Sequence, residues 1–469
     1  MTLLRWVVLP SVGATLIVVL LALACRWIWQ TSRPLGIIVA AGLAMRLAAA
    51  TALFWTSYLH LPLLSSLQLG SGFWRMALDA PGYHVSSTIA AETSLASLPD
   101  GTPSPAYVQA LALWMRLAGT SPFSAVLLNL TCYVTTCTLL VGAMRGLTSR
   151  HADLVRRITL LALTASPMLL FVSTQVLKDD FFLLFSAMLS TGVWWIALML
   201  GAPAVASWRR LVPGLLAVSV GVFVTAGVRV YYPAIASLCF GLAFVVALLG
   251  RRRVSWRLVF GCAALTIVTA GTALAFGSEE GRNYLDVIGG ARSPGDAVSM
   301  VDGARAGFIA TGGSTNIGDD DAAVATPSLL GRVRGVVMGL ATMFVPLVVL
   351  RVLGLVSVAG GAAMMALGDL DTLFFDAVFI AVVTLSWRMY RDQRPNIAYL
   401  TYAVGLVVLL CVLMGYTVTN VGTLVRLRLM VLVPLVTMPL AFSRLPRYLR
   451  EDDREPAVAL SGGSPTPAG

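Results

Sequence analysis

The stretch WVVLPSVGATLIVVLLALACRWIW, residues 6–29, is an apolar run long enough to cross a lipid bilayer as one helix. Comparable apolar runs recur along the chain, and the period-2 alternation typical of barrel strands does not. Hydrophobic residues make up 58% of the sequence and charged residues 12%. Soluble domains have about 45–50% and about 25%, respectively. Because a backbone in lipid must satisfy its own hydrogen bonds, the sequence predicts an all-α, polytopic transmembrane helical bundle.

The positions of the arginines predict the orientation of the bundle. Arg26 and Arg33 flank the linker between the first two apolar runs, which places this linker in the cytoplasm and the N-terminus outside. Alternating from there, hydropathy predicts about 11–13 spans, with the arginine-rich turns all on the cytoplasmic side. The polar stretches 61–105 and 277–333 then become two exoplasmic loop regions. The segment 448–469, rich in Ser, Pro and Gly, is predicted to be a disordered cytoplasmic tail.

The net charge of +11 follows from the same arginines. A soluble protein of this charge would be a candidate for binding nucleic acid, but here the cations lie in short loops between apolar runs, so nucleic acid is not an expected partner. The six cysteines all fall inside apolar runs, in spacings that fit neither a zinc site nor a disulfide framework. We therefore predict no metal-ligating residues.

The first long polar interruption, SGFWRMALDAPGYHVSSTIAAETSLASLPDGTPSPAY at residues 71–107, contains Asp79, Tyr83 and His84. A carboxylate just outside the membrane suits a general base that takes a proton from a hydroxyl group. Asp79 is therefore the candidate catalytic residue, with Tyr83 and His84 as candidate substrate contacts. The alternative interpretation of Asp79 is a solvated loop aspartate.

Cations also occur at predicted exoplasmic ends of spans, where the orientation rule disfavours them. Lys178, the only lysine of the chain, precedes Asp179, and Arg229 lies close to Tyr231. These four residues are further candidate substrate contacts. An ammonium is a compact charge suited to a lipid-borne phosphate, and aromatic rings at this depth suit a sugar or prenyl group. The alternatives are an ion pair between Lys178 and its neighbouring aspartates, and a snorkelling arginine in an aromatic belt.

A further candidate segment runs from residue 416 to residue 428 and contains Asn420, Arg426 and Arg428. Arginines at a membrane edge are functional candidates by default. Asn420 and Arg426 are therefore added to the candidate substrate contacts. Separate basic positions on one predicted face indicate a single anionic ligand at the outer leaflet. Three consecutive aspartates at 319–321 leave a divalent cation open as a cofactor, although nothing in the sequence requires one.

Together these residues resemble the GT-C superfamily of membrane glycosyltransferases, which includes protein O-mannosyltransferases and bacterial aminoarabinose transferases. The similarity is greatest to bacterial relatives of the dolichyl-phosphate-mannose type that occur with surface polysaccharide genes. It covers about residues 35–447. The motifs that carry it are Asp79-Ala80-Pro81-Gly82-Tyr83-His84, Ser104-Pro105-Ala106-Tyr107, Leu117-Ala118-Gly119-Thr120-Ser121-Pro122, Ser166-Pro167 with Leu177-Lys178-Asp179, and Asn420-Val421-Gly422-Thr423 with Arg426.

The resemblance implies an inverting transfer of a sugar from a polyprenyl-phosphate donor to a glycan, lipid or protein acceptor on the extracytoplasmic side of the plasma or inner membrane. It implies that Asp79 is catalytic and that Lys178 and Arg229 hold the donor phosphate. Residues 1–34 would be an extra N-terminal span ahead of a GT-C-like module at 35–447. No acidic partner lies directly beside Asp79, which departs from the family pattern and leaves metal dependence open.

Two other functions remain open from the sequence. An O-antigen-type polysaccharide polymerase or ligase also uses outer-face arginines and a long outer loop, and its essential residues here would be Arg305 or Arg334. A non-enzymatic lipid-glycan transporter would show internal pseudo-symmetry and polar residues at the middle of the bilayer. The spans show few signs of either feature.

Overall fold

The computed structural model describes residues 9–95, 98, 102–201, 208–229, 231–249, 299, 301–306, 328–354, 362–418 and 421–443. In these ranges the chain is all-α, as predicted, apart from one small antiparallel hairpin. Among the described residues, six helices are long and apolar enough to cross a membrane, or seven if a bent helix pair counts as one span. The protein is therefore a multi-pass membrane protein by helix length and composition.

The described elements follow the predicted apolar runs closely. The N-terminal half contains α1 (Leu9–Thr31), α2 (Arg33–Tyr58), β1 (Gln68–Gly70), β2 (Phe73–Trp74), α3 (Asp79–Glu92), α4 (Pro105–Ala118), α5 (Pro122–Met144), α6 (Ala152–Ala165), α7 (Pro167–Ser173) and α8 (Asp179–Gly201). The C-terminal half contains α9 (Trp208–Ala226), α10 (Tyr231–Leu249), α14 (Leu329–Phe344), α15 (Leu347–Val352), α16 (Ala362–Asp392), α17 (Ile397–Thr417), α18 (Val421–Leu427), α19 (Leu429–Thr437) and η6 (Met438–Phe442).

Within the described ranges the structure has six or seven candidate spans, whereas hydropathy predicts 11–13 for the whole chain. α9 and α10 are helices of 19 residues each, and α14 and α15 are short helices of 16 and 6 residues. The predicted span at 258–276 and the tail at 448–469 lie outside the described residues.

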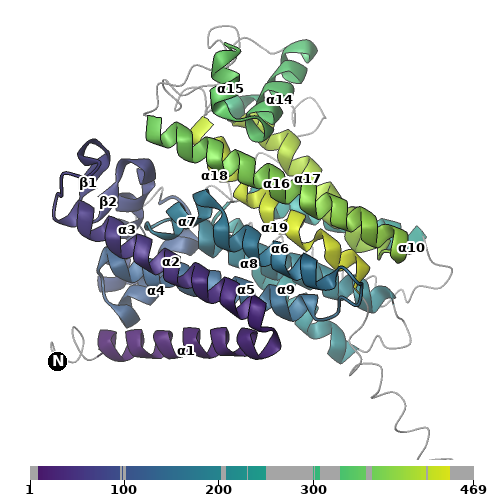
Figure 1. Ribbon diagram of the computed structural model, residues 1–469, viewed down its shortest axis with the longest axis horizontal. Coiled ribbons are helices and arrows are strands. Elements are labelled where there is room, and N and C mark those ends of the chain that lie inside the picture. The colour runs from purple at the N-terminus through teal and green to yellow at the C-terminus, as the bar shows by residue number, and fades with distance from the viewer. Residues whose placement is uncertain are drawn as a thin grey trace, which may run out of the picture.

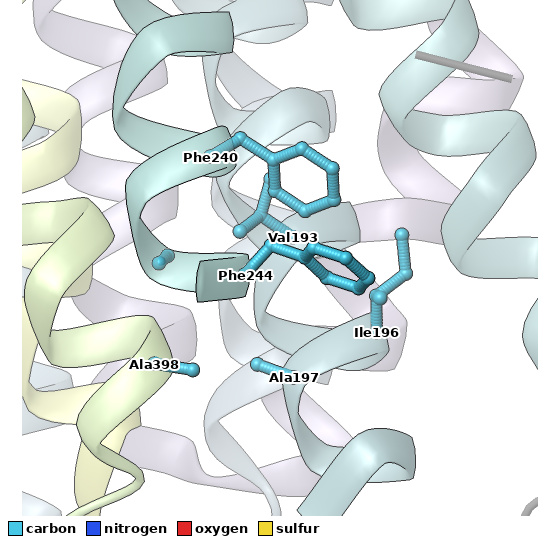
Figure 2. Close-up of a pocket in the computed structure, with 7 residues that line it drawn as sticks. Val193, Ile196, Ala197, Phe240, Phe244 and Ala398 are labelled. Carbon is cyan, nitrogen blue, oxygen red and sulfur yellow. The ribbon is translucent and has the colours of Figure 1, made fainter. Parts of the chain in front are cut away.

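The segment 423–442 forms the most enclosed part of the bundle. In its most apolar stretch of 18 residues, 94% of the residues are buried. The corresponding shares are 17% for α1 and 22% for α2, which lie along the outside (Figure 1). α8 packs against α5, α9 and α19, which makes it the central support of the bundle. Between α8, α10 and α17 only a small apolar gap of about 10 Å³ remains, lined by residues such as Val193, Phe240 and Ala398 (Figure 2). That is no more than the space of one water molecule, so this gap is a packing defect.

The break between α6 and α7 is caused by Pro167. Proline lacks the N–H that the Leu163 carbonyl would accept, and the two helices meet at an angle of 53°. The buried guanidinium of Arg46, on α2, donates to the carbonyl oxygens of Leu163 at 2.6 Å and Thr164 at 3.0 Å. An arginine inside a span thus replaces the helical hydrogen bonds that the proline removes.

Replacing Arg46 by methionine should lower the free energy of unfolding by about 2 kcal/mol, because two buried carbonyl oxygens lose their donors. Unfolding in mixed detergent micelles, followed by circular dichroism, measures this. Arg33→Met is the matched control, because Arg33 is exposed on the same helix. Equal stability of the two variants would show that Arg46 does not support the break.

The two ends of the bundle differ in charge. Arg145, Arg150 and Arg156 lie at the end where α5 finishes, and Arg150 pairs there with Asp392 at 3.1 Å. The β1–β2 hairpin and the start of α3 lie together at the other end (Figure 1). That second end holds the residues described next.

Candidate functional site

Asp79 occupies the first turn of α3 rather than a loop, and its side chain is 55% exposed. A carboxylate in the first helical turn is favoured because the helix N-terminus carries partial positive charge. Its Oδ2 atom accepts a hydrogen bond at 3.0 Å from Nη1 of Arg426, which is 347 positions later in the sequence. The fold therefore brings the candidate base and a distant cation into direct contact.

Arg426 also contacts a second, buried carboxylate. Its Nε atom lies 2.7 Å from Oδ2 of Asp179, and the Oδ1 atom of the same aspartate pairs with Nη2 of Arg229. Asp179 begins α8 and is 1% exposed, and Arg229 follows α9 and is 5% exposed. The order Asp79–Arg426–Asp179–Arg229, drawn from four separate elements, is named here the charge chain.

The charge chain has hydrogen-bonding capacity that it does not use. Within the described residues, Nε and Nη1 of Arg229 and Nη2 of Arg426 are buried without a hydrogen-bond partner. The guanidinium of Arg229 also lies 5.1 Å from the ring centre of Phe182. Leaving buried charged donors unpaired costs about 1–3 kcal/mol or more for each group. Two arginines with free donors at one place suit an anionic acceptor such as a phosphate.

Lys178 lies next to the charge chain. Its Nζ donates to Ser104 Oγ and to the Val228 carbonyl, and it lies 5.6 Å from the ring centre of Tyr83. Burial, together with the nearby charges of Arg229 and Arg426, lowers the pKa of Lys178 to about 7. The lysine can therefore gain or lose its charge near neutral pH.

Ser104 and Tyr83 complete the immediate surroundings of Lys178. Ser104 adopts the left-handed backbone conformation (φ 57°) immediately before α4, and its hydroxyl donates to the Val228 carbonyl at 3.1 Å. Strained residues of this kind concentrate at functional sites. Burial raises the pKa of Tyr83 to about 12, so this phenol is uncharged. Sequence reasoning missed the role of Ser104, although its place directly before Pro105 in a quoted motif was a usable signal.

Two of the predicted substrate contacts, His84 and Tyr231, have other neighbours, and a third cannot be placed. His84 contacts the Thr120 carbonyl at 2.9 Å and the ring of Phe73, and burial lowers its pKa. Tyr231 begins α10 and is half-buried, and its neighbour Tyr232 is the tyrosine that packs on Phe182. Asn420 lies outside the described residues. Tyr83 follows Asp79 by four positions and shares its face of α3, whereas His84 follows it by five positions and points to another face.

Arg428 lies two positions after Arg426 in the sequence but does not join the charge chain. It is fully buried and pairs with Asp371 at 3.2 Å, and it donates to the Met343 carbonyl and to Thr372. Asp371 in turn accepts from the Met168 N–H at the start of α7. The contacts of this pair join α7, α14 and α16 to the start of α19. Arg428 therefore supports the fold. Sequence reasoning missed its partner Asp371.

A second polar cluster includes a residue of the alternative function. Arg305 donates to the Tyr416 carbonyl, and Asp302 accepts from the Tyr416 hydroxyl and pairs with Arg332 at 2.7 Å. The ion pair with Arg332 lowers the pKa of Asp302. Arg334 is exposed. In this cluster Arg305 thus fastens the segment 301–306 to the end of α17.

The described residues include no group of three or more His, Cys, Asp or Glu side chains placed to hold a metal ion. The aspartates at 319–321 lie outside the described residues. The charge chain alternates acids and bases, so its carboxylates are neutralised by arginines. Comparisons with models of protein families, with curated proteins and with solved structures find no match for this chain.

Proposed function

We propose that this protein is an inverting membrane glycosyltransferase that moves a sugar from a polyprenyl-phosphate donor to an acceptor on the extracytoplasmic side. The observation that carries the proposal is the charge chain with its unused arginine donors. A partly exposed carboxylate stands at one end, and two arginines and a lysine that suit a phosphate stand beside it. The acceptor is a glycan, a lipid or a protein with a free hydroxyl.

The distribution of arginines supports a reaction on the extracytoplasmic side. The charge chain lies at the end of the bundle opposite Arg145, Arg150 and Arg156. Because arginine-rich turns are retained in the cytoplasm, the charge chain faces the other compartment. Polyprenyl-phosphate sugars that have been moved to the outer leaflet are available on that side.

The proposed chemistry needs one base and one anion site. Asp79 takes the proton of the acceptor hydroxyl while the acceptor oxygen bonds to the anomeric carbon. The bond between this carbon and the phosphate oxygen breaks, and the prenyl phosphate leaves with the electron pair. Arg229 and Arg426 donate hydrogen bonds to the phosphate as its charge grows. The acceptor arrives opposite the leaving group, so the configuration at the anomeric carbon inverts.

Arg426 links donor binding to the activity of the base. Without donor, Arg426 is shared between Asp79 and Asp179. A donor phosphate competes with Asp79 for this guanidinium, and the exposed Asp79 exchanges more readily than the buried Asp179. Asp79 then becomes free to accept a proton when the donor is in place.

Donor binding should weaken as the pH rises through about 7, because Lys178 loses the charge that attracts phosphate. Affinity for a short-chain prenyl-phosphate sugar, a phosphodiester whose charge stays constant in this range, should fall about tenfold between pH 6 and pH 8 when measured by titration calorimetry. Lys178→Arg is the control variant, because a guanidinium stays charged across this range. An equal fall in both proteins would assign the pH dependence to another group.

The proposal is tested by incubating the purified protein with a set of polyprenyl-phosphate sugars and measuring the release of prenyl phosphate. Prenyl phosphate should bind to the wild type, and Arg229→Gln should weaken this binding. Arg334→Gln is a matched control at an exposed arginine outside the charge chain. Wild-type affinity in Arg229→Gln would contradict the assignment of the anion site.

A further inference from the structure

A large hollow lies toward the end of the bundle opposite the charge chain. It has a volume of about 620 Å³ and is lined by α5, α8 and α9. This volume is in the range of small-ligand sites. α8 packs against both neighbours and supplies the floor, which includes Thr191 and Trp194. Exposed positions on α5 and α9, Gly142 and Pro213, mark the two walls. This hollow is named here the α5–α9 cleft.

Missing side chains produce the cleft. Gly142 on α5 faces Gly192 on α8 and Gly214 on α9 around the same space. A Cβ atom at Gly192 would lie 2.9 Å from the Gly214 carbonyl oxygen, so α8 and α9 approach closely at the floor. At Gly142 the nearest heavy atom to an added Cβ is 3.8 Å away, on Trp27 of α1. The wall at Gly142 therefore has room for a larger side chain.

The mouth of the cleft is cationic and aromatic. Arg145 is exposed there, donates to Thr31 at 2.6 Å and lies 4.3 Å from the ring centre of Trp27. Trp195 also lines the cleft. The described lining residues include hydroxyl and apolar groups and no carboxylate. Tryptophan and arginine at the end of an apolar groove are typical of the membrane interface.

α9 carries a further arginine, Arg210, before the residues Pro213, Gly214 and Ala217 that line the cleft. Arg210 lies in the first turn of α9, at the same end as Arg145. Basic pockets between membrane helices bind the head groups of anionic lipids.

We propose that the α5–α9 cleft binds an anionic phospholipid from the leaflet at this end of the bundle, with an acyl chain along Gly142 and Ala217 and the head-group phosphate at Arg145. Charge complementarity selects this occupant, because the mouth offers cations and the walls are apolar. The site is independent of the proposed transferase activity. It would anchor α1 and α9 to the central helices through a shared lipid.

Native mass spectrometry of the protein in mild detergent, with dioleoyl-phosphatidylglycerol or dioleoyl-phosphatidylcholine added, tests the site. Wild type should retain phosphatidylglycerol in preference to phosphatidylcholine. Gly142→Leu should lose the bound lipid, because it adds bulk to the wall along which the acyl chain is proposed to lie. Gly241→Leu is the matched control, since an added Cβ at Gly241 meets open space on α10, and Gly241 does not line the cleft. Retention of lipid by Gly142→Leu at the level of Gly241→Leu would overturn the proposal.

The head-group contact is tested separately. Arg145→Gln should bind phosphatidylglycerol about fivefold more weakly, since one arginine near a lipid surface is worth about 1 kcal/mol. Its affinity for phosphatidylcholine should stay near that of the wild type. Arg150→Gln is the control, as an exposed arginine at the same end that pairs with Asp392. Equal loss in both variants would indicate general surface charge, and absence of lipid from the wild type would show that the cleft holds no lipid.

Discussion

The variant Asp79→Asn is expected to fold normally and to lose sugar transfer by about 10²-fold or more, because an amide cannot take the proton of the acceptor hydroxyl. Asparagine keeps the size of the side chain and can still accept a hydrogen bond from Arg426. The ion pair with Arg426 is 55% exposed on the Asp79 side. Losing such a pair costs at most about 1 kcal/mol, so the effect should appear in the rate and not in the stability.

The measurement is the initial rate of transfer by purified protein, with prenyl-phosphate binding measured in parallel. Asp153→Asn is the matched control, because Asp153 also lies in the first turn of a helix and pairs with an arginine, at the other end of the bundle. Donor binding should persist in Asp79→Asn, because this carboxylate competes with the donor for Arg426. A wild-type rate in Asp79→Asn would remove Asp79 as the base.

The same assay separates the proposed transferase from the polymerase or ligase alternative. That alternative makes Arg305 or Arg334 essential and Asp79 dispensable. Arg305→Ala should retain transfer activity under the proposal, with a reduced stability because the contact with Tyr416 is lost. If Arg305→Ala or Arg334→Ala abolishes activity while Asp79→Asn retains it, the alternative function is the better one.

The variant Asp179→Asn is expected to cause a large loss of stability, about 3–5 kcal/mol. Asp179 is 1% exposed and is the shared partner of Arg229 and Arg426, so the substitution leaves two guanidiniums without a buried counter-charge. Breaking a buried pair costs much more than the pair contributes, because the remaining charge stays desolvated. The double variant Asp179→Asn/Arg229→Gln should recover part of the loss, since it removes one of the unpaired charges.

Denaturation in mixed detergent micelles measures these differences. Asp392→Asn is the matched control, because Asp392 pairs with the exposed Arg150. Its substitution should cost at most about 1 kcal/mol. If Asp179→Asn is no less stable than Asp392→Asn, or if the double variant is less stable than Asp179→Asn, the charge chain does not carry the stability assigned to it.

Much of the fold could be predicted from sequence alone. The helix at Pro105–Ala118 and the span at Ile397–Thr417 follow apolar runs with clear end signals, a proline at the start of one and a capping Asn396 before the other. The limits of α6 and α7 were less predictable. Their apolar run continues through Pro167, and the bend depends on Arg46 and Asp371, which are far from it in sequence.

The charged residues of the candidate site could be predicted from the sequence. Lys178, Arg229 and Arg426 stand out because cations are disfavoured at the predicted exoplasmic ends of spans, and Asp79 and Asp179 stand out as carboxylates on the same predicted face. Their pairing was not predictable, because each contact joins separate helices. Arg426 and Arg428 illustrate the limit: both interrupt an apolar stretch two positions apart, and one joins the charge chain while the other pairs with Asp371.

By itself the sequence determined that the chain is a helical membrane protein with a few unusual charges near the ends of its spans. Apolar length and arginine position are local properties, and lipid imposes them on each span separately. Only the tertiary structure decided which charges meet. The direction of a side chain on a helix depends on the rotation of that helix against its neighbours, and packing over the whole bundle sets this rotation.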